Sequence, residues 1–150
     1  MRIFLRLLDE AVSLLMLIFK PMRVGVKMLL IKDGNLVLVK HKYGCDWYLP
    51  GGGLKKNESV EEGGRREAAE EIGATLGKVR IFGVYSRAGS NKHTVVLICE
   101  DFTFTGETDF EIEEIGIFPV DNLPEGVSGA TRRRAADYLA RETMNGLGRW

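Results

Sequence analysis

The sequence predicts an α+β fold. Apolar runs of strand length outnumber helical patterns, and the two do not alternate in the regular rhythm of a parallel βαβ sheet. No repeat, low-complexity tract or linker interrupts the chain, and its 150 residues fit one domain with a buried core.

The predicted sheet begins with a hairpin. Residues 24–31 and 36–39 are apolar at nearly every position, and Asp33-Gly34 between them is a strong turn signal. A short strand at residues 47–49 is stopped by Pro50 and a run of three glycines. Further strands are predicted at residues 76–85, 93–103 and 112–120.

A helix is predicted after the glycines, at residues 59–72. Ser59 and Glu62 have the spacing of a capping box, and Gly73 supplies the left-handed residue that commonly ends a helix. Gly63 and Gly64 lie inside this helix, where each costs about 1 kcal/mol relative to alanine. Either they allow close packing on the sheet, or the first turns of the helix are loose. A second helix is predicted at residues 131–144, with three side chains facing inward: Ala135, Tyr138 and Leu139.

The N-terminus carries an apolar run at residues 11–19, which is shorter than the roughly 20 residues of a membrane span. No small-residue cleavage site follows it before Pro21, so a signal peptide is not expected. We expect an extra helix at residues 3–19, packed on the body or on a second subunit; a helix lying on a membrane surface is the alternative. The chain then divides into an N-terminal helical extension, 1–22, and a main domain, 23–150.

The overall charge is balanced, with 21 basic and 21 acidic residues, so no global field would attract nucleic acid. The two cysteines, Cys45 and Cys99, have neither a metal-binding spacing nor a disulfide framework, which is typical of free thiols in a reducing cytoplasm. We therefore expect a cytoplasmic protein without a nucleic-acid partner.

Three acidic residues of the first helix share one face. Glu67, Glu70 and Glu71 are spaced i, i+3, i+4, and their mutual repulsion would destabilise an isolated helix. A bound cation would reverse the sign of that effect. Carboxylate oxygens suit hard ions, above all Mg²⁺, which often binds substrate phosphates as well.

Residues 52–74 carry nine residues at a fixed spacing: Gly52, Glu58, Arg66, Glu67, Ala68, Glu70, Glu71, Gly73 and Ala74. These nine positions resemble the signature box of the Nudix hydrolases. The resemblance implies an α/β/α sandwich around a mixed sheet, with Mg²⁺ or Mn²⁺ held by Glu67, Glu70 and Glu71. By the same resemblance Glu67 is a candidate catalytic base, Arg66 pairs with Glu58 to hold the loop, and a homodimer is possible.

Other candidate residues lie outside the acidic helix face. Gly51, Gly52 and Gly53 let backbone groups approach a metal or phosphate without a Cβ in the way, and Gly52 and Gly53 are candidate substrate-binding residues. Lys40 and Lys42 could hold phosphate, or could be plain surface lysines. Glu114 is a candidate for the additional metal-binding or basic glutamate that similar enzymes place in a loop; an exposed acid is the alternative.

The leading functional hypothesis is a metal-dependent hydrolase that cleaves a diphosphate linkage in a nucleoside diphosphate derivative. Nucleoside triphosphates are the default substrates, and nucleotide sugars, ADP-ribose and dinucleoside polyphosphates are the alternatives. The alternative is a Nudix-fold module that senses a nucleotide without cleaving it. Such modules commonly lose box glutamates, and this chain keeps all of them. A third hypothesis is a membrane-attached protein that uses its Leu-rich N-terminus.

Overall fold

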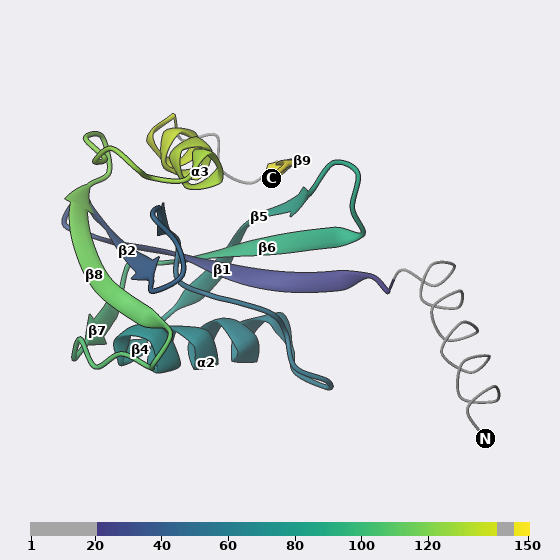
Figure 1. Cartoon of the computed structure of the whole chain (residues 1–150), viewed down its shortest axis with the longest axis horizontal. Helices are drawn as coiled ribbons and strands as arrows, with labels where there is room; N and C mark the ends of the chain where they lie inside the picture. The colour runs from purple at the N-terminus through teal and green to yellow at the C-terminus, as the bar shows by residue number, and fades with distance from the viewer. Residues whose placement is uncertain (1–20, 141–145) are drawn as a thin grey trace, which may run out of the picture.

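A computed structural model describes residues 21–140 and 146–150 (Figure 1). The predicted N-terminal helix lies outside these residues. Within them, a seven-stranded sheet has the order β3-β2-β1-β6-β5-β9, and β8 pairs with β2. Its strands are β1 (Arg23–Lys32), β2 (Asn35–His41), β3 (Trp47–Tyr48), β5 (Val79–Ser86), β6 (Lys92–Cys99), β8 (Ile112–Pro119) and β9 (Gly146–Arg149).

The sheet is mixed, because β1 runs parallel to β6 and β5 parallel to β9, whereas the other pairs are antiparallel. The predicted hairpin is confirmed: β1 and β2 pair next to the turn, through Ile31 with Leu36 and Lys32 with Asn35. Beyond that turn β2 leaves β1, so the first half of β1 has an edge open to another segment.

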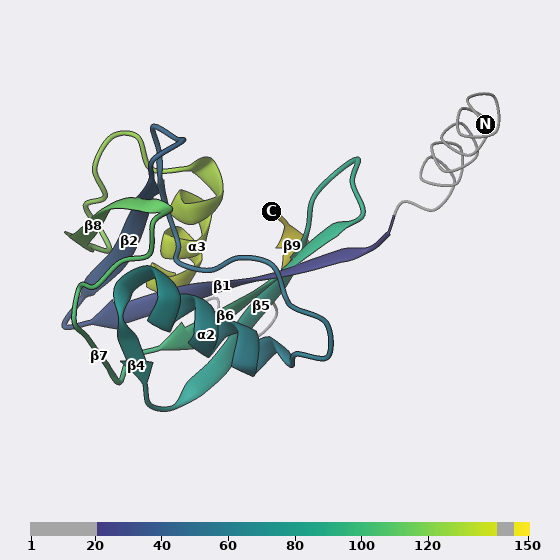
Figure 2. The ribbon, with the colours of Figure 1, turned by 60° about the horizontal axis from the view of Figure 1, so that its bottom comes forward.

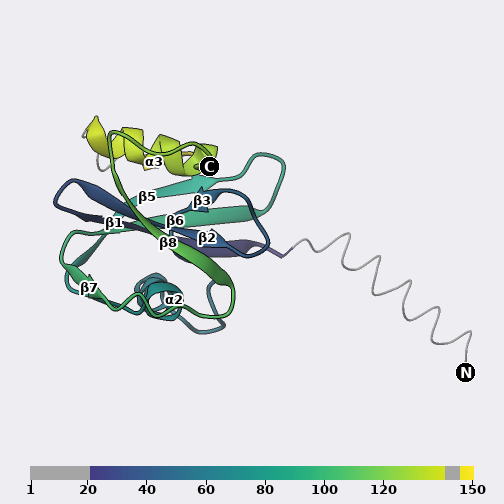
Figure 3. The ribbon, with the colours of Figure 1, turned by 60° about the vertical axis from the view of Figure 1, so that its left-hand side comes forward.

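One helix covers each face of the sheet (Figures 2 and 3). The side chains of β1 alternate between the two resulting cores. Met28 packs in the core beneath α2 (Val60–Ile72), and Leu29 packs in the core beneath α3 (Gly129–Leu139). The expected sandwich around a mixed sheet is thereby confirmed. Neither helix in the described ranges has the length and apolar character that crossing a membrane requires.

The ends and the close packing of α2 follow the prediction. Ser59 and Glu62 form the capping box, and Gly73 ends the helix with φ 65°. A Cβ on Gly64 would lie 2.7 Å from the Met28 sulfur, and one on Gly63 would lie 2.4 Å from Leu54 Cδ2. Both glycines therefore bring the helix closer to its neighbours than alanine would allow.

Two predicted strands are each broken in two. The segment 76–85 separates into β4 (Ala74–Leu76) and β5, and the segment 93–103 into β6 and β7 (Phe102–Phe104). The break falls where the Gly77 N–H donates to the Asp101 carbonyl, 2.7 Å away, and β4 and β7 form a separate two-stranded sheet. A glycine and an acidic pair at these points are the sequence signals for the break.

The inward placement of Leu139 is wrong. Leu139 is 48% exposed, whereas Ala135 is buried as expected. Tyr138 packs against the core, as predicted, and its hydroxyl donates to Glu100. The helix ends at Leu139, so the last turn extends past the core that Ala135 covers; residues 141–144 of the predicted helix lie outside the described ranges.

Candidate active site

The glycine run pairs with the open edge of β1. Where β2 has left β1, the Val26 N–H donates to the Gly52 carbonyl at 2.9 Å and the Met28 N–H to the Pro50 carbonyl at 2.8 Å. At Gly51 φ is 125°, and a Cβ would lie 2.3 Å from the Val26 carbonyl oxygen. The loop can therefore approach β1 this closely only with glycine at position 51.

Two glutamates of α2 meet this loop. Glu71 is 5% exposed, and its Oε2 accepts the Gly51 N–H at 2.7 Å. The Glu67 carboxylate lies against Gly52, where a Cβ would be 2.8 Å from both Glu67 oxygens. The one-turn spacing of the two glutamates thus places both carboxylates beside consecutive glycines.

Arg66 joins the helix to the loop, as the sequence predicts. Its Nε donates to Glu58 Oε1 at 2.7 Å and its Nη2 to Glu58 Oε2 at 2.9 Å, a bidentate pair. Its Nη1 also donates to Glu67 at 2.8 Å and to Glu70 at 3.0 Å. Hydrogen bonds from Arg66 lower the pKa of Glu58 to about 2, so Glu58 stays ionised. One guanidinium therefore orients three carboxylates.

We expect Arg66→Lys to lower kcat/KM by about 10- to 100-fold, the effect typical of losing a group that positions metal ligands. Lysine keeps the charge but cannot make the bidentate pair with Glu58. The control is Arg65→Lys, because Arg65 pairs with Glu61 and with carbonyls away from the loop. Steady-state kinetics that gave equal activity for both variants would contradict this role of Arg66.

The prediction from sequence missed Lys27, whose Nζ donates to the Gly51 carbonyl. Burial lowers the pKa of Lys27, and the negative charges of Glu71 and Glu67 partly oppose that effect. Gly51 thus lies between a carboxylate on its N–H and an ammonium on its carbonyl. The available signal was the single lysine within the otherwise apolar run 24–31.

Glu71 has an altered acidity. Burial raises the pKa of Glu71 to about 7; Glu67 and Asp109 act in the same direction, whereas Lys27 and the Gly51 N–H oppose it. Asp109, also missed, accepts backbone hydrogen bonds from Glu111 and Ile112 before β8. The glutamate predicted from this region, Glu114, is exposed and lies opposite Lys40 across the β2–β8 pair.

The shift at Glu71 predicts how the stability of the metal-free protein depends on pH. Since the folded pKa of about 7 exceeds the ordinary value of 4.5, the stabilisation is complete below 4.5 and is lost as the pH rises through 7. The wild type should lose up to about 3 kcal/mol relative to Glu71→Gln over this window. Thermal melts of both proteins in EDTA, from about pH 5 to 8, measure this loss; parallel pH profiles would contradict it.

The carboxylates of Glu67, Glu70 and Glu71 are the kind of ligand that a hard divalent cation prefers, but only two of them already lie together. Within residues 21–140 and 146–150, no three acidic, histidine or cysteine side chains lie close enough together to hold an ion as they stand. Glu67 and Glu71 already meet at the glycine loop. Glu70 pairs with Arg66 and with Lys55, and its side chain is 46% exposed, so it would have to leave these pairs and rotate to join the other two carboxylates. Water ligands, which Mg²⁺ usually retains, would complete such a site.

A cavity of about 320 Å³ lies beside the glycine loop. Three cations line it, Arg23, Lys27 and Lys92, together with Gly51, Gly52, Gly53, Thr94 and Trp150. The two glycines predicted to bind substrate are therefore part of its wall. Lys40 and Lys42 do not line it, and their phosphate-binding role stays a prediction.

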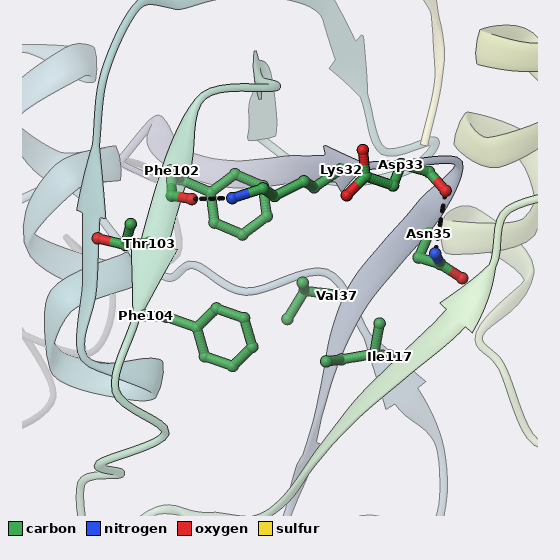
Figure 4. A pocket seen from close by; sticks show the side chains of 8 residues that line it. All are labelled: Lys32, Asp33, Asn35, Val37, Phe102, Thr103, Phe104 and Ile117. Atoms are coloured by element: carbon green, nitrogen blue, oxygen red, sulfur yellow. Dashed lines mark hydrogen bonds between the residues drawn. The ribbon is translucent and has the colours of Figure 1, made fainter.

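A second cavity, of about 390 Å³, lies at the turn end of β1 and β2 (Figure 4). Val37, Phe104 and Ile117 face one another across it, and Lys32 reaches over it to the Phe102 carbonyl. No residue of α2 or of the glycine loop lines this cavity. It is therefore separate from the acidic helix face.

The fold and the site agree with the comparisons to known proteins. Residues 21–139 match the NUDIX domain, so the chain belongs to the Nudix family. The predictions of a Nudix hydrolase, and of a pyrophosphohydrolase acting on nucleoside diphosphate derivatives, are thereby confirmed. Members of this family are typically metal-dependent.

Two relatives carry different names. The chain is 27% identical to a MutT-like protein of Streptomyces ambofaciens over 108 residues, which are 72% of this chain and 70% of the relative. It is 30% identical to an ADP-ribose pyrophosphatase of Methanocaldococcus jannaschii over 110 residues, which are 68% of this chain and 64% of the relative.

Solved structures show the same fold. A MutT Nudix hydrolase from Burkholderia pseudomallei has a TM-score of 0.69 at 28% identity, covering 76% of this chain and 95% of that one. An ADP-ribose pyrophosphatase from Streptococcus suis has a TM-score of 0.68 at 19% identity, covering 86% and 98%, and shares the fold alone.

Proposed function

We propose that this Nudix pyrophosphohydrolase depends on Mg²⁺ or Mn²⁺ and that it binds and cleaves the diphosphate linkage of its nucleoside diphosphate derivative at the glycine loop. The observation that carries the proposal is the arrangement around Gly51. A buried glutamate binds its N–H, a half-buried lysine binds its carbonyl, and a cavity with three cationic side chains opens beside it. Acidic groups for a cation and basic groups for phosphates thus meet at one loop.

Each group has a role in this proposal. Arg23, Lys27 and Lys92 would attract and hold the negatively charged phosphates. Glu67 and Glu71, with Glu70 after rotation, would hold the cation. When bound, Mg²⁺ neutralises phosphate charge and makes water more acidic.

Glu67 is our proposal for the general base, because its carboxylate lies directly at the loop. Glu114 is the second candidate for that role, and Lys40 and Lys42 are further candidates for phosphate contacts. Arg66 orients Glu67 and does not itself touch the phosphates in this proposal.

We choose the first substrates to test from the names of the two relatives. Nucleoside triphosphates and ADP-ribose represent the MutT-like protein and the ADP-ribose pyrophosphatase. A panel of about twenty diphosphate compounds should be measured by phosphate and nucleotide release, with Mg²⁺, with Mn²⁺ and in EDTA. We expect metal-dependent turnover of at least one nucleoside derivative. Tight binding without any turnover would instead support the nucleotide-sensing alternative.

A further inference from the structure

Trp150 forms one wall of the cavity beside the glycine loop. It follows β9, which pairs with β5 and lies beside it in Figures 1 and 2. The Trp150 N–H donates to the Ser86 carbonyl at 3.1 Å, and the side chain is half-buried. Trp150 lies beyond residues 21–139, the range matched to the family. The family match therefore assigns it no role.

The indole is held in a defined place. Its ring contacts that of Tyr85, with centroids 6.1 Å apart and an interplanar angle of 55°. Tyr85 is buried, and the Arg134 guanidinium lies 3.7 Å from its ring centroid. Arg134 also donates to the Arg149 carbonyl at 3.4 Å. Arg134 of α3 thus holds the backbone of Arg149, and Tyr85 of β5 lies against the Trp150 ring.

The cavity walls differ in chemistry. Arg23, Lys27 and Lys92 are suited to phosphate, whereas Trp150 is the aromatic residue that lines the cavity within the described part of the chain. Aromatic rings hold nucleobases by stacking, which tolerates different bases because every base has a π-face. A nucleotide has both parts, an anionic diphosphate and a flat base.

We propose that Trp150 stacks on the nucleobase of the substrate and so makes β9 a specificity element of the enzyme. This inference rests on the proposed function, because it assumes that the diphosphate lies along the glycine loop. It predicts that the enzyme distinguishes nucleoside diphosphates from diphosphates that lack a base.

Two ligands that share a methylene-bridged pair of anionic phosphorus groups test the stacking proposal. One is α,β-methylene ADP, which cannot be cut between its phosphates, and the other is methylenediphosphonate, which lacks the nucleoside. Calorimetry with Mg²⁺ should show that Trp150→Ala binds the nucleotide about 10-fold more weakly. The affinity for methylenediphosphonate should not change, and Trp150→Phe should restore most of the nucleotide affinity.

Fluorescence gives an independent readout, because the chain has two tryptophans. Trp47 packs on Phe118 and does not line the cavity. Adding α,β-methylene ADP should quench Trp47→Phe as strongly as the wild type, and the quench should vanish in Trp150→Phe.

The outcomes separate this inference from the proposed function. If Trp150→Ala binds both ligands as the wild type does, or loses both equally, the stacking role is overturned while the hydrolase proposal stands. If the wild type binds neither ligand and hydrolyses no nucleotide, both are overturned.

Discussion

Replacing Glu71 with glutamine is expected to lower kcat/KM by about 100-fold or more while leaving the metal-free protein folded. The amide oxygen of the new side chain can still accept the Gly51 N–H, so the loop keeps its support. The variant loses the negative charge that would bind a divalent cation, and with it the charge neutralisation that the ion supplies to the phosphates.

The control for this variant is Glu61→Gln, on the same helix. Glu61 is exposed and pairs with Arg65 rather than with the loop. Circular dichroism and thermal melts in EDTA should show both variants folded. If Glu71→Gln hydrolysed the best panel substrate as fast as the wild type, Glu71 would be removed from the metal site.

The second large effect is on stability, at Gly51. We expect Gly51→Ala to lower the free energy of unfolding by about 3 kcal/mol or more. A Cβ there would lie 2.3 Å from the Val26 carbonyl oxygen and 3.0 Å from Lys27 Cα, both backbone atoms of a central strand. The φ of 125° adds conformational strain of about 1 to 3 kcal/mol.

Gly53→Ala is the matched control two residues away. A Cβ on Gly53 would have no neighbour within 4 Å, and its φ is not positive. Its free energy of unfolding should stay within about 0.5 kcal/mol of the wild type. Urea titrations of the wild type and both variants measure these free energies of unfolding. Similar midpoints for Gly51→Ala and Gly53→Ala would contradict the close packing of Gly51 against β1.

Features set by neighbours in the sequence were predictable. The hairpin at Asp33-Gly34, the capping box at Ser59 and the end of α2 at Gly73 each depend on residues a few positions apart. The acidic face of α2 was predictable for the same reason, since i, i+3 and i+4 spacing places side chains on one face of a helix.

Features set by distant contacts were not predictable. Lys27 reaches Gly51 only because β2 leaves β1 and the glycine run takes its place. Asp109 acts on Glu71 from a segment that precedes β8, and Trp150 reaches the cavity through the pairing of β9 with β5. The spacing of these residues along the chain gives no hint of their proximity.

The error at Leu139 has a different origin. Apolar spacing placed it on the same face as Ala135, but the pattern does not show where the underlying core ends. The breaks at Gly77 and Asp101 are similar, because apolar runs of this kind continue through residues that leave the main sheet.

The central claim is that carboxylates of α2 hold a divalent cation beside the glycine loop. Electron paramagnetic resonance of Mn²⁺ measures this directly, by titrating the ion into the wild type, Glu67→Gln and Glu61→Gln without nucleotide. We expect Mn²⁺ to bind the wild type and Glu61→Gln alike, and Glu67→Gln at least about 10-fold more weakly. Equal Mn²⁺ affinity in all three proteins, or no binding to the wild type, would contradict the claim.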